Sequence, residues 1–239
     1  MSRHYRLGVP LAEGALAVVA ERPAHHLLHV LRARVGDRFT GVGVRGEVHE
    51  VEVVALAPLC VQVGPGVALG AEPVAPLTVW LPLLKGGRSD DLVRQLTELG
   101  VTRVVPWCGE RSVVRLDGRK AGERVARWQA IAAEATEQCG RVAVPEIAPV
   151  SEGLPESGPG VFFWEEAREL ARDGLAAEAE RGALSVLVGP EGGLSPREAA
   201  ALVARGWRPA WLGARVLRAE TAVVVAATLA LGALGDGGY

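Results

Sequence analysis

Strand-like and helix-like segments alternate from residue 77 almost to the C-terminal end, and this alternation limits the possible folds more than any other feature. Short runs rich in Val and Leu predict buried strands at 77–83, 103–107, 160–164 and 184–188. Longer segments with apolar residues at helical spacing lie between them. Such alternation is typical of a mostly parallel sheet covered by helices. We therefore predict an α/β fold for this part of the chain.

Helices are predicted at 89–99, 122–139 and 165–181, and an apolar helix is predicted at 221–234. One more helix has a clear start, because Ser195 suits the N-cap, Pro196 the first helical position and Glu198 the third. These residues predict a capping box. A short strand is expected at 209–212, with Thr221 starting the last helix.

The first 72 residues have a different pattern. Valine-rich or alternating runs at 38–44 and 47–56 predict strands, and one helical stretch is expected at 25–34. Glycine and proline at 64–66 and 70–76 suggest a linker. The sequence thus predicts two domains, 1–72 and 73–239.

Two glycine-rich segments, 189–195 and 212–222, each follow a predicted strand and lead into a predicted helix. Loops at such junctions can build one small-molecule site at the carboxyl edge of a parallel sheet. Leu194, Leu212 and Leu217 could flank a base, while backbone amides bind an adenine edge and a ribose. The alternatives are a tight turn without ligand and a capped helix with surface arginines. Neither segment has the glycine spacing of a dinucleotide fold or the lysine of a P-loop.

The formal net charge is −2, which does not indicate nucleic-acid binding by itself. The charges are unevenly spread, however, with eight basic and five acidic residues in 103–141 against two and nine in 146–180. A local basic surface can attract phosphate on a near-neutral protein. Only Lys85 and Lys120 are lysine, a bias that suits bidentate phosphate contacts or reflects a GC-rich genome.

Cysteine usage and apolar segments indicate the compartment. The three cysteines are isolated in sequence, so no disulfide framework or zinc ribbon is predicted and a reducing cytoplasm is expected. The first residues lack the apolar core of a signal peptide. The apolar run 221–234 is too short to span a bilayer, so no membrane association is expected. His25 and His29 are four residues apart but lack a third ligand, and we predict no metal site.

Several motifs resemble the RsmE family of SPOUT-class methyltransferases, which methylate N3 of a uridine in 16S ribosomal RNA. The most specific are Gly-Pro-Glu-Gly-Gly at 189–193 and Leu-Gly-x-Arg-x-Leu-Arg-x-Glu-Thr-Ala at 212–222. Further similarities lie at 95–100, 110–112, Arg127-Trp128, the series from Glu134 to Pro145, and His26 with 30–32. Gln95 stands where the family usually has lysine.

The resemblance implies a C-terminal SPOUT α/β domain with a deep trefoil knot and an N-terminal PUA-like β-barrel that holds RNA. It also implies S-adenosyl-L-methionine as cofactor, a homodimer, and 16S rRNA or the small ribosomal subunit as partner. The residues that it assigns to cofactor binding are Trp164, Gly189, Glu191, Gly192, Leu212, Gly213, Leu217, Arg218, Glu220, Thr221 and Ala222.

Methylation at N3 of uridine requires that the base be unpaired and that the N3 proton be lost. Arg141 or Arg218 could stabilise the resulting anion, and Glu134 or Glu191 could accept the proton. The sequence leaves both choices open.

Phosphate contacts are expected from seven arginines: Arg3, Arg6, Arg32, Arg111, Arg124, Arg127 and Arg141. The alternative is that these arginines are solvated charges on helix faces. Two further function classes remain beside the methyltransferase: a non-catalytic RNA-binding assembly factor and an α/β enzyme using another adenine nucleotide.

Overall fold

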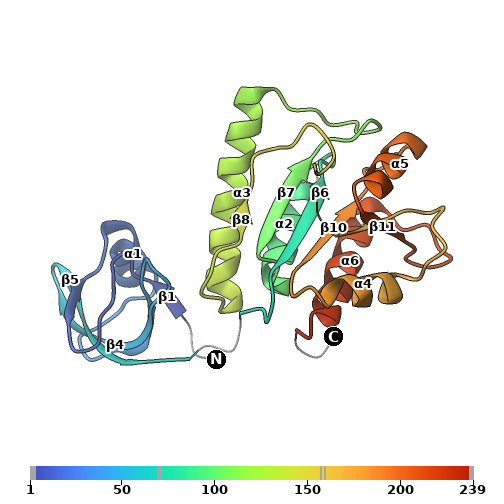
Figure 1. Ribbon diagram of the computed structural model, residues 1–239. Helices are drawn as coiled ribbons and strands as arrows, with labels where there is room; N and C mark the ends of the chain where they lie inside the picture. Colours follow the sequence, from blue (N-terminus) through green and yellow to red (C-terminus); the bar gives the residue numbers. More distant parts are fainter. Residues whose placement is uncertain (1–3, 69–71, 157, 159, 237–239) are drawn as a thin grey trace. The chain divides into compact units, whose positions relative to one another are not determined.

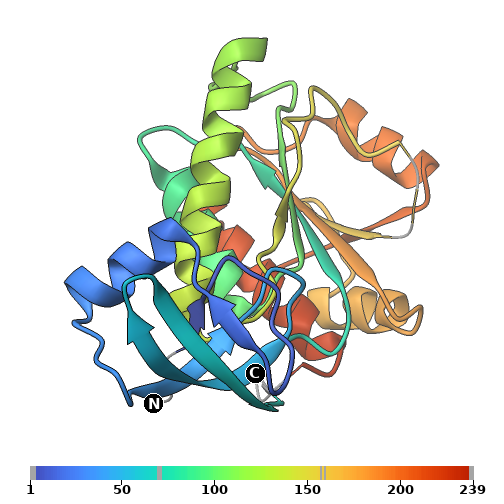
Figure 2. The same cartoon turned by 90° about the vertical axis from the view of Figure 1, so that its left-hand side faces the viewer.

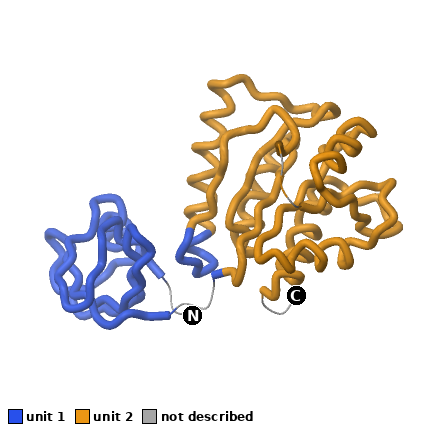
Figure 3. The backbone as a smooth tube through the Cα atoms, viewed as in Figure 1, with its two compact units in different colours: residues 1–72, 136–143 blue, residues 73–135, 144–239 orange. Residues whose placement is uncertain are grey.

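The computed structural model describes residues 4–68, 72–156, 158 and 160–236, and the chain divides into two compact units. The first unit comprises residues 1–72 and 136–143, and the second comprises 73–135 and 144–239 (Figure 3). The grouping of 136–143 with the first unit was not predicted from the sequence. This segment is the end of a long helix and the turn that follows it.

The first unit is built on a five-stranded sheet in the order β1-β3-β4-β5-β2. β1 pairs in parallel with β3, and the other pairs are antiparallel. The strands are β1 (His4–Arg6), β2 (Leu16–Val18), β3 (Arg38–Val42), β4 (Val48–Leu56) and β5 (Leu59–Gly66). Leu7, Val53 and Val61 are fully buried in the core of this unit.

Two predictions for the first unit were wrong. Its helical segment is α1 (Glu21–His25) continued by a π-helical turn (His26–Val30), so it begins and ends earlier than the predicted 25–34. The glycine and proline at 64–66 belong to the end of β5 and are not a linker. Gly64 packs there against the backbone of β4, because a Cβ would lie 3.1 Å from the carbonyl oxygen of Glu50.

The second unit contains the predicted parallel sheet, in the order β11-β9-β10-β6-β7-β8 (Figure 1). All the paired strands run parallel. They are β6 (Leu77–Pro82), β7 (Arg103–Trp107), β8 (Glu146–Ile147), β9 (Gly160–Phe163), β10 (Leu184–Val188) and β11 (Trp207–Ala210). The α/β prediction is thereby confirmed.

Helices cover both faces of this sheet because its strands are apolar on both sides. They are α2 (Arg88–Leu99), α3 (Gly118–Cys139), α4 (Ala171–Ala179), α5 (Pro196–Ala204) and α6 (Ala219–Ala233). One core cluster joins the sheet to α2, α3, α4 and α6. A second cluster, rich in tryptophan, joins the other face to α5. Figure 2 shows α4 and α5 on opposite sides of the sheet.

The predicted capping box of α5 is present. The hydroxyl of Ser195 accepts a hydrogen bond from the backbone of Glu198 (3.1 Å), and the Glu198 carboxylate accepts one from the backbone of Ser195 (2.8 Å). Thr221, by contrast, does not start the last helix. α6 begins at Ala219 with Arg218 as its N-cap, so Thr221 lies within the first turn.

The predicted helix 165–181 begins only at Ala171. The preceding residues are tied to the end of β11, because the backbone N–H of Trp211 donates to the carbonyl of Glu169 (2.8 Å) and Leu170 forms a parallel bridge with Trp211. This pairing holds Leu170 in extended conformation and delays the helix.

Asp90 links α2 to α3. Its carboxylate accepts hydrogen bonds from the indole N–H of Trp128 and from Arg127, both at 2.8 Å, and lies 3.5 Å from Arg124. The Asp90 side chain is 12% exposed and Trp128 is fully buried. A buried donor that loses its acceptor is costly, so this carboxylate should contribute strongly to the stability of the second unit.

We predict that Asp90→Ala lowers the free energy of unfolding by about 2 to 3 kcal/mol, because it leaves the Trp128 indole N–H unpaired. Urea unfolding followed by tryptophan fluorescence measures this, since all six tryptophans belong to the second unit. Asp91→Ala is the control. Asp91 is 71% exposed and pairs only at the surface with Arg94, so its loss should cost about 0.5 kcal/mol or less. Equal effects of the two substitutions would contradict the prediction.

Candidate functional site

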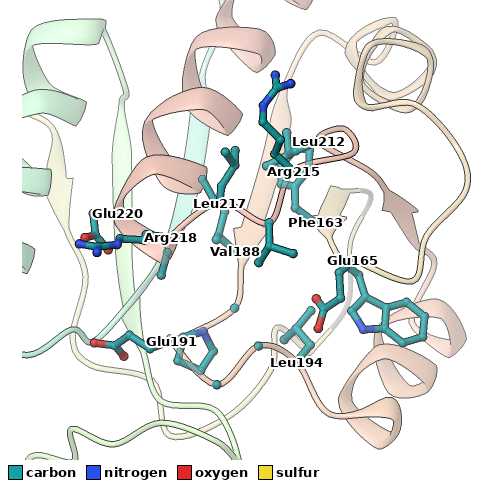
Figure 4. A pocket seen from close by; sticks show the side chains of 18 of the residues that line it. Phe163, Glu165, Val188, Glu191, Leu194, Leu212, Arg215, Leu217, Arg218 and Glu220 are labelled. Carbon is teal, nitrogen blue, oxygen red and sulfur yellow. The ribbon is translucent and has the colours of Figure 1, made fainter.

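A cavity of about 860 Å³ opens at the carboxyl ends of β9, β10 and β11, which are neighbours in the sheet. The residues that follow each strand form its walls: 163–165 after β9, 188–194 at the end of β10, and 211–220 after β11. Both glycine-rich loops therefore meet in one pocket, as the sequence predicts. Figure 4 shows the side chains of the two loops facing each other across it.

The loop after β11 leaves the strand through a backbone turn that requires glycine. Gly213 has φ +117°, in the region that other residues rarely adopt, and no atom of the described chain lies within 4 Å of where its Cβ would be. Leu212 and Leu217 pack against the core, whereas Val216 is 92% exposed. The loop is thus anchored at both ends and exposed at its tip.

Acidic and basic groups gather on one side of the pocket, where Figure 4 places Glu191, Arg218 and Glu220. Arg88, at the start of α2, lies 3.9 Å from the carboxylates of both Glu191 and Glu220. The second oxygen of Glu220 is buried and has no hydrogen-bond partner among the described residues. A buried acceptor without a partner is costly, so this oxygen is suited to a donor or cation on a ligand.

The pocket contains almost every residue that the resemblance assigns to the cofactor. Thr221 is the exception, because it is exposed on α6 and is not part of the described lining. The pocket lining also includes Arg88, Phe163, Glu165 and Trp211, which were not predicted from the sequence. They could have been predicted only from their positions at the ends of β9 and β11 and at the start of α2.

The candidate catalytic residues are separated by the fold. Glu191 and Arg218 line the pocket. Glu134 is exposed on α3, outside the described lining. Arg141 belongs to the first unit, where its side chain is 2% exposed and lies 3.4 Å from Glu72. Of the four candidates, Glu191 and Arg218 are therefore the two at the pocket.

The arginines predicted to bind RNA in the first unit differ in exposure. Arg3 lies outside the described residues. Arg6 is half-buried, where it donates to the carbonyl of Val142, and burial lowers the pKa of its guanidinium. Arg32 is exposed and has φ +56°, which is unusual for a side chain of this size. Arg141 is too buried to reach a phosphate, which argues against that prediction.

The remaining predicted arginines have partners in the second unit. Arg124 and Arg127 pair with Asp90, although the Arg127 side chain is still 65% exposed. Arg111 donates to the carbonyl groups of Gly192 and Leu194, both at 3.2 Å. These arginines therefore have structural contacts in addition to any contact with RNA.

No three His, Cys, Asp or Glu side chains in the described part of the chain are grouped closely enough to hold a metal ion. The rings of His25 and His29 lie 4.5 Å apart. A search of the same residues finds no helix with the length and apolar character needed to cross a membrane.

Comparisons with known proteins identify the family of this chain. A family model described as an RNA methyltransferase domain matches residues 71–231. The ribosomal RNA small subunit methyltransferase E of Mycobacterium bovis is 32% identical over 238 residues, covering 93% of this chain and 87% of the relative. The enzyme of the same name from Synechocystis is 32% identical over 210 residues, covering 84% and 68%.

Among solved structures, that of the Neisseria gonorrhoeae ribosomal RNA small subunit methyltransferase E bound to S-adenosyl methionine has a TM-score of 0.81 to this chain. The two are 28% identical, and the match covers 95% of this chain and 96% of that one. The shared fold, the family match and the relatives that span most of the sequence show that this chain belongs to the ribosomal RNA small subunit methyltransferase E family.

Proposed function

We propose that this protein transfers a methyl group from S-adenosyl-L-methionine to N3 of a specific uridine in the 16S RNA of the small ribosomal subunit. One observation carries the proposal: in a chain of this family, both glycine-rich loops and the end of β9 enclose a single pocket at the carboxyl edge of the sheet. The solved Neisseria relative of the same fold is bound to this cofactor.

The pocket residues fit this cofactor. Leu194, Leu212 and Leu217 provide apolar walls for an adenine ring, and the open space beside Gly213 leaves room for a ligand close to the backbone. The partnerless oxygen of Glu220 can accept from an amino group. When bound, S-adenosylmethionine supplies a methyl group activated by its positively charged sulfur.

Two pocket residues suit the chemistry of the uridine. Glu191 can accept the N3 proton, and the Arg218 guanidinium, exposed at the N-terminus of α6, can stabilise the negative charge left on the base. The helix N-terminus adds a partial positive charge at the same place. The base must be unpaired or flipped out before its N3 edge can reach these groups.

The rest of the assembly follows from the family. We propose that residues 1–72 form a PUA-like barrel and 73–239 the methyltransferase domain, whose last helix passes through a deep trefoil knot. Two copies would form a homodimer through the knotted domains, with exposed arginines such as Arg32 contacting the RNA. The ribosomal substrate and three free cysteines support a cytoplasmic location.

Loss of the gene should remove one 3-methyluridine from 16S rRNA, because the proposed function makes this protein the source of that methyl group. Nucleoside mass spectrometry of 16S rRNA from a deletion strain measures this, and re-expression of the wild-type chain should restore the nucleoside. Full retention of 3-methyluridine in the deletion strain would overturn the proposed function.

We expect Gly213→Val to weaken S-adenosylmethionine binding by about tenfold or more, because a β-branched residue at this φ must reshape the loop. Isothermal titration calorimetry on the purified protein measures the change. Gly206→Val is the matched control, since Gly206 has φ +85° and open space around it but does not line the pocket. A Gly213 variant that binds like wild type would show that the site is elsewhere.

Glu191→Gln should lower the single-turnover methylation rate by about 10²- to 10⁴-fold, the range typical of general base catalysis. Glutamine keeps the shape of the side chain and an oxygen that can accept the hydrogen bond from the backbone N–H of Lys85. Hydroxide should replace the lost base, so the rate of the variant should rise steadily with pH. A variant with the wild-type rate at neutral pH would exclude Glu191 as the proton acceptor.

A further inference from the structure

We infer that Arg111, supported by Glu110, is a positioning residue that fixes the cofactor loop 189–194, and that its main role is not to contact phosphate. The inference rests on the proposed function, since it takes that loop as part of the S-adenosylmethionine site. Both residues belong to a turn after β7, a strand separated from β10 by β6. The turn therefore reaches across one strand to the loop that follows β10.

The Arg111 side chain holds the far end of the loop. Its Nη1 atom donates to the carbonyl oxygens of Gly192 and Leu194, both at 3.2 Å. One guanidinium nitrogen thus fixes two peptide groups that are two residues apart. Hydrogen bonds from a charged donor are stronger than neutral ones, so they can hold an exposed loop in one conformation.

The backbone of Arg111 also packs directly against the loop. A Cβ on Gly192 would lie 2.9 Å from the Arg111 Cβ and 3.1 Å from its carbonyl oxygen. Only glycine fits this contact without a shift of one segment. The close packing explains the glycine at position 192 by its neighbour in the turn after β7 rather than by a ligand.

Glu110 contacts the residues that directly follow the loop, where α5 begins. Its carboxylate accepts a hydrogen bond from the Ser195 hydroxyl (2.7 Å), and its backbone N–H donates to the carboxylate of Glu198 (2.7 Å). The turn itself is closed by Ser112, whose hydroxyl accepts from the backbone of Gly109 (2.8 Å). Glu110, Arg111 and Ser112 therefore form one clamp on the C-terminal part of the loop and the start of α5, residues 192–198.

Arg111 is an exposed residue, so its position alone does not exclude a phosphate contact. Here Nη1 already serves two loop carbonyls, so RNA binding through the same atom would compete with loop geometry. In contrast, Arg119 on α3 is 81% exposed, and its one ion pair among the described residues is with Glu123 at 3.6 Å. Arg119→Ala therefore removes the same charge from the second unit without loosening the loop, which makes it a matched control.

The test compares S-adenosylmethionine binding by calorimetry, without RNA, for wild type, Arg111→Ala, Arg111→Lys and Arg119→Ala. Arg111→Ala should weaken binding about tenfold or more, because two charge-assisted hydrogen bonds to the loop are lost. Arg119→Ala should bind like wild type. Arg111→Lys should fall between wild type and alanine, because an ammonium keeps the charge without the rigid fork.

Kinetics and RNA binding separate positioning from phosphate contact. Arg111→Ala should raise KM for S-adenosylmethionine while kcat at saturating cofactor stays within about a factor of two. The slope of log affinity for RNA against log salt should match wild type, whereas loss of one phosphate contact would reduce it by about 0.9. Gly192→Ala should also weaken cofactor binding, because the added Cβ pushes the loop away from Arg111. In the double variant with Arg111→Ala, the loss of binding free energy should be smaller than the sum of the two single losses.

Wild-type cofactor affinity in Arg111→Ala, together with a reduced salt slope, would overturn the inference and assign Arg111 to the RNA. Should the alanine variant fail to fold, the lysine variant decides: unchanged cofactor affinity contradicts the inference, and partial loss supports it. A wild-type protein that does not bind S-adenosylmethionine would instead overturn the proposed function. The two failures are therefore distinct.

Discussion

Parallel pairing of β9 with both β10 and β11 is the constraint on which the site depends. Three adjacent strands that run the same way end at one edge, so the loops after them must meet there. These loops come from parts of the chain about 20 to 50 residues apart in sequence, from Glu165 to Glu220, as the positions of the lining residues show. No single motif could enclose the pocket alone. The sheet determines the shape of the pocket, and the residues at the strand ends determine its chemistry.

The last helix fits this sheet because its buried face consists mainly of small side chains. Ala222, Ala226, Ala227 and Ala230 are buried with Val223 and Leu231, and α6 packs against β6 and β10 and against α2 and α4. Alanine allows the helix axis to approach its neighbours closely. The same packing sets where α6 begins, and thereby brings Arg218 and Glu220 to the pocket wall. The helix α6 thus contributes both to the packing of the core and to the geometry of the site.

Local patterns in the sequence predicted most of the parallel sheet, since β6, β7, β9 and β10 each coincide with a run rich in apolar residues. The two-residue strand β8 has no such run and was not predicted. The capping box of α5 could also be predicted from the sequence, because all its partners lie within four residues. The start of α4 could not be predicted, because it depends on the bridge from Leu170 to Trp211, forty-one residues further along. Glu191 and Arg218 lie on loops whose position follows from strand order. Glu134 lies on α3 and Arg141 in the turn that follows it, and no spacing rule reveals the contacts of this region with distant segments.

The first unit is completed by residues that the chain reaches late. Glu72 accepts hydrogen bonds from the backbone of Val142 and Ala143 (2.8 Å for Ala143) and pairs with Arg141, while Arg6 donates to the carbonyl of Val142. During synthesis, the N-terminal sheet therefore emerges with this carboxylate and guanidinium unpaired until residue 143 has left the ribosome. A fragment that ends at residue 72 would lack the same partners for the Glu72 carboxylate and the Arg6 guanidinium. The first unit is thus completed only after residues 73–135 of the second unit have been made.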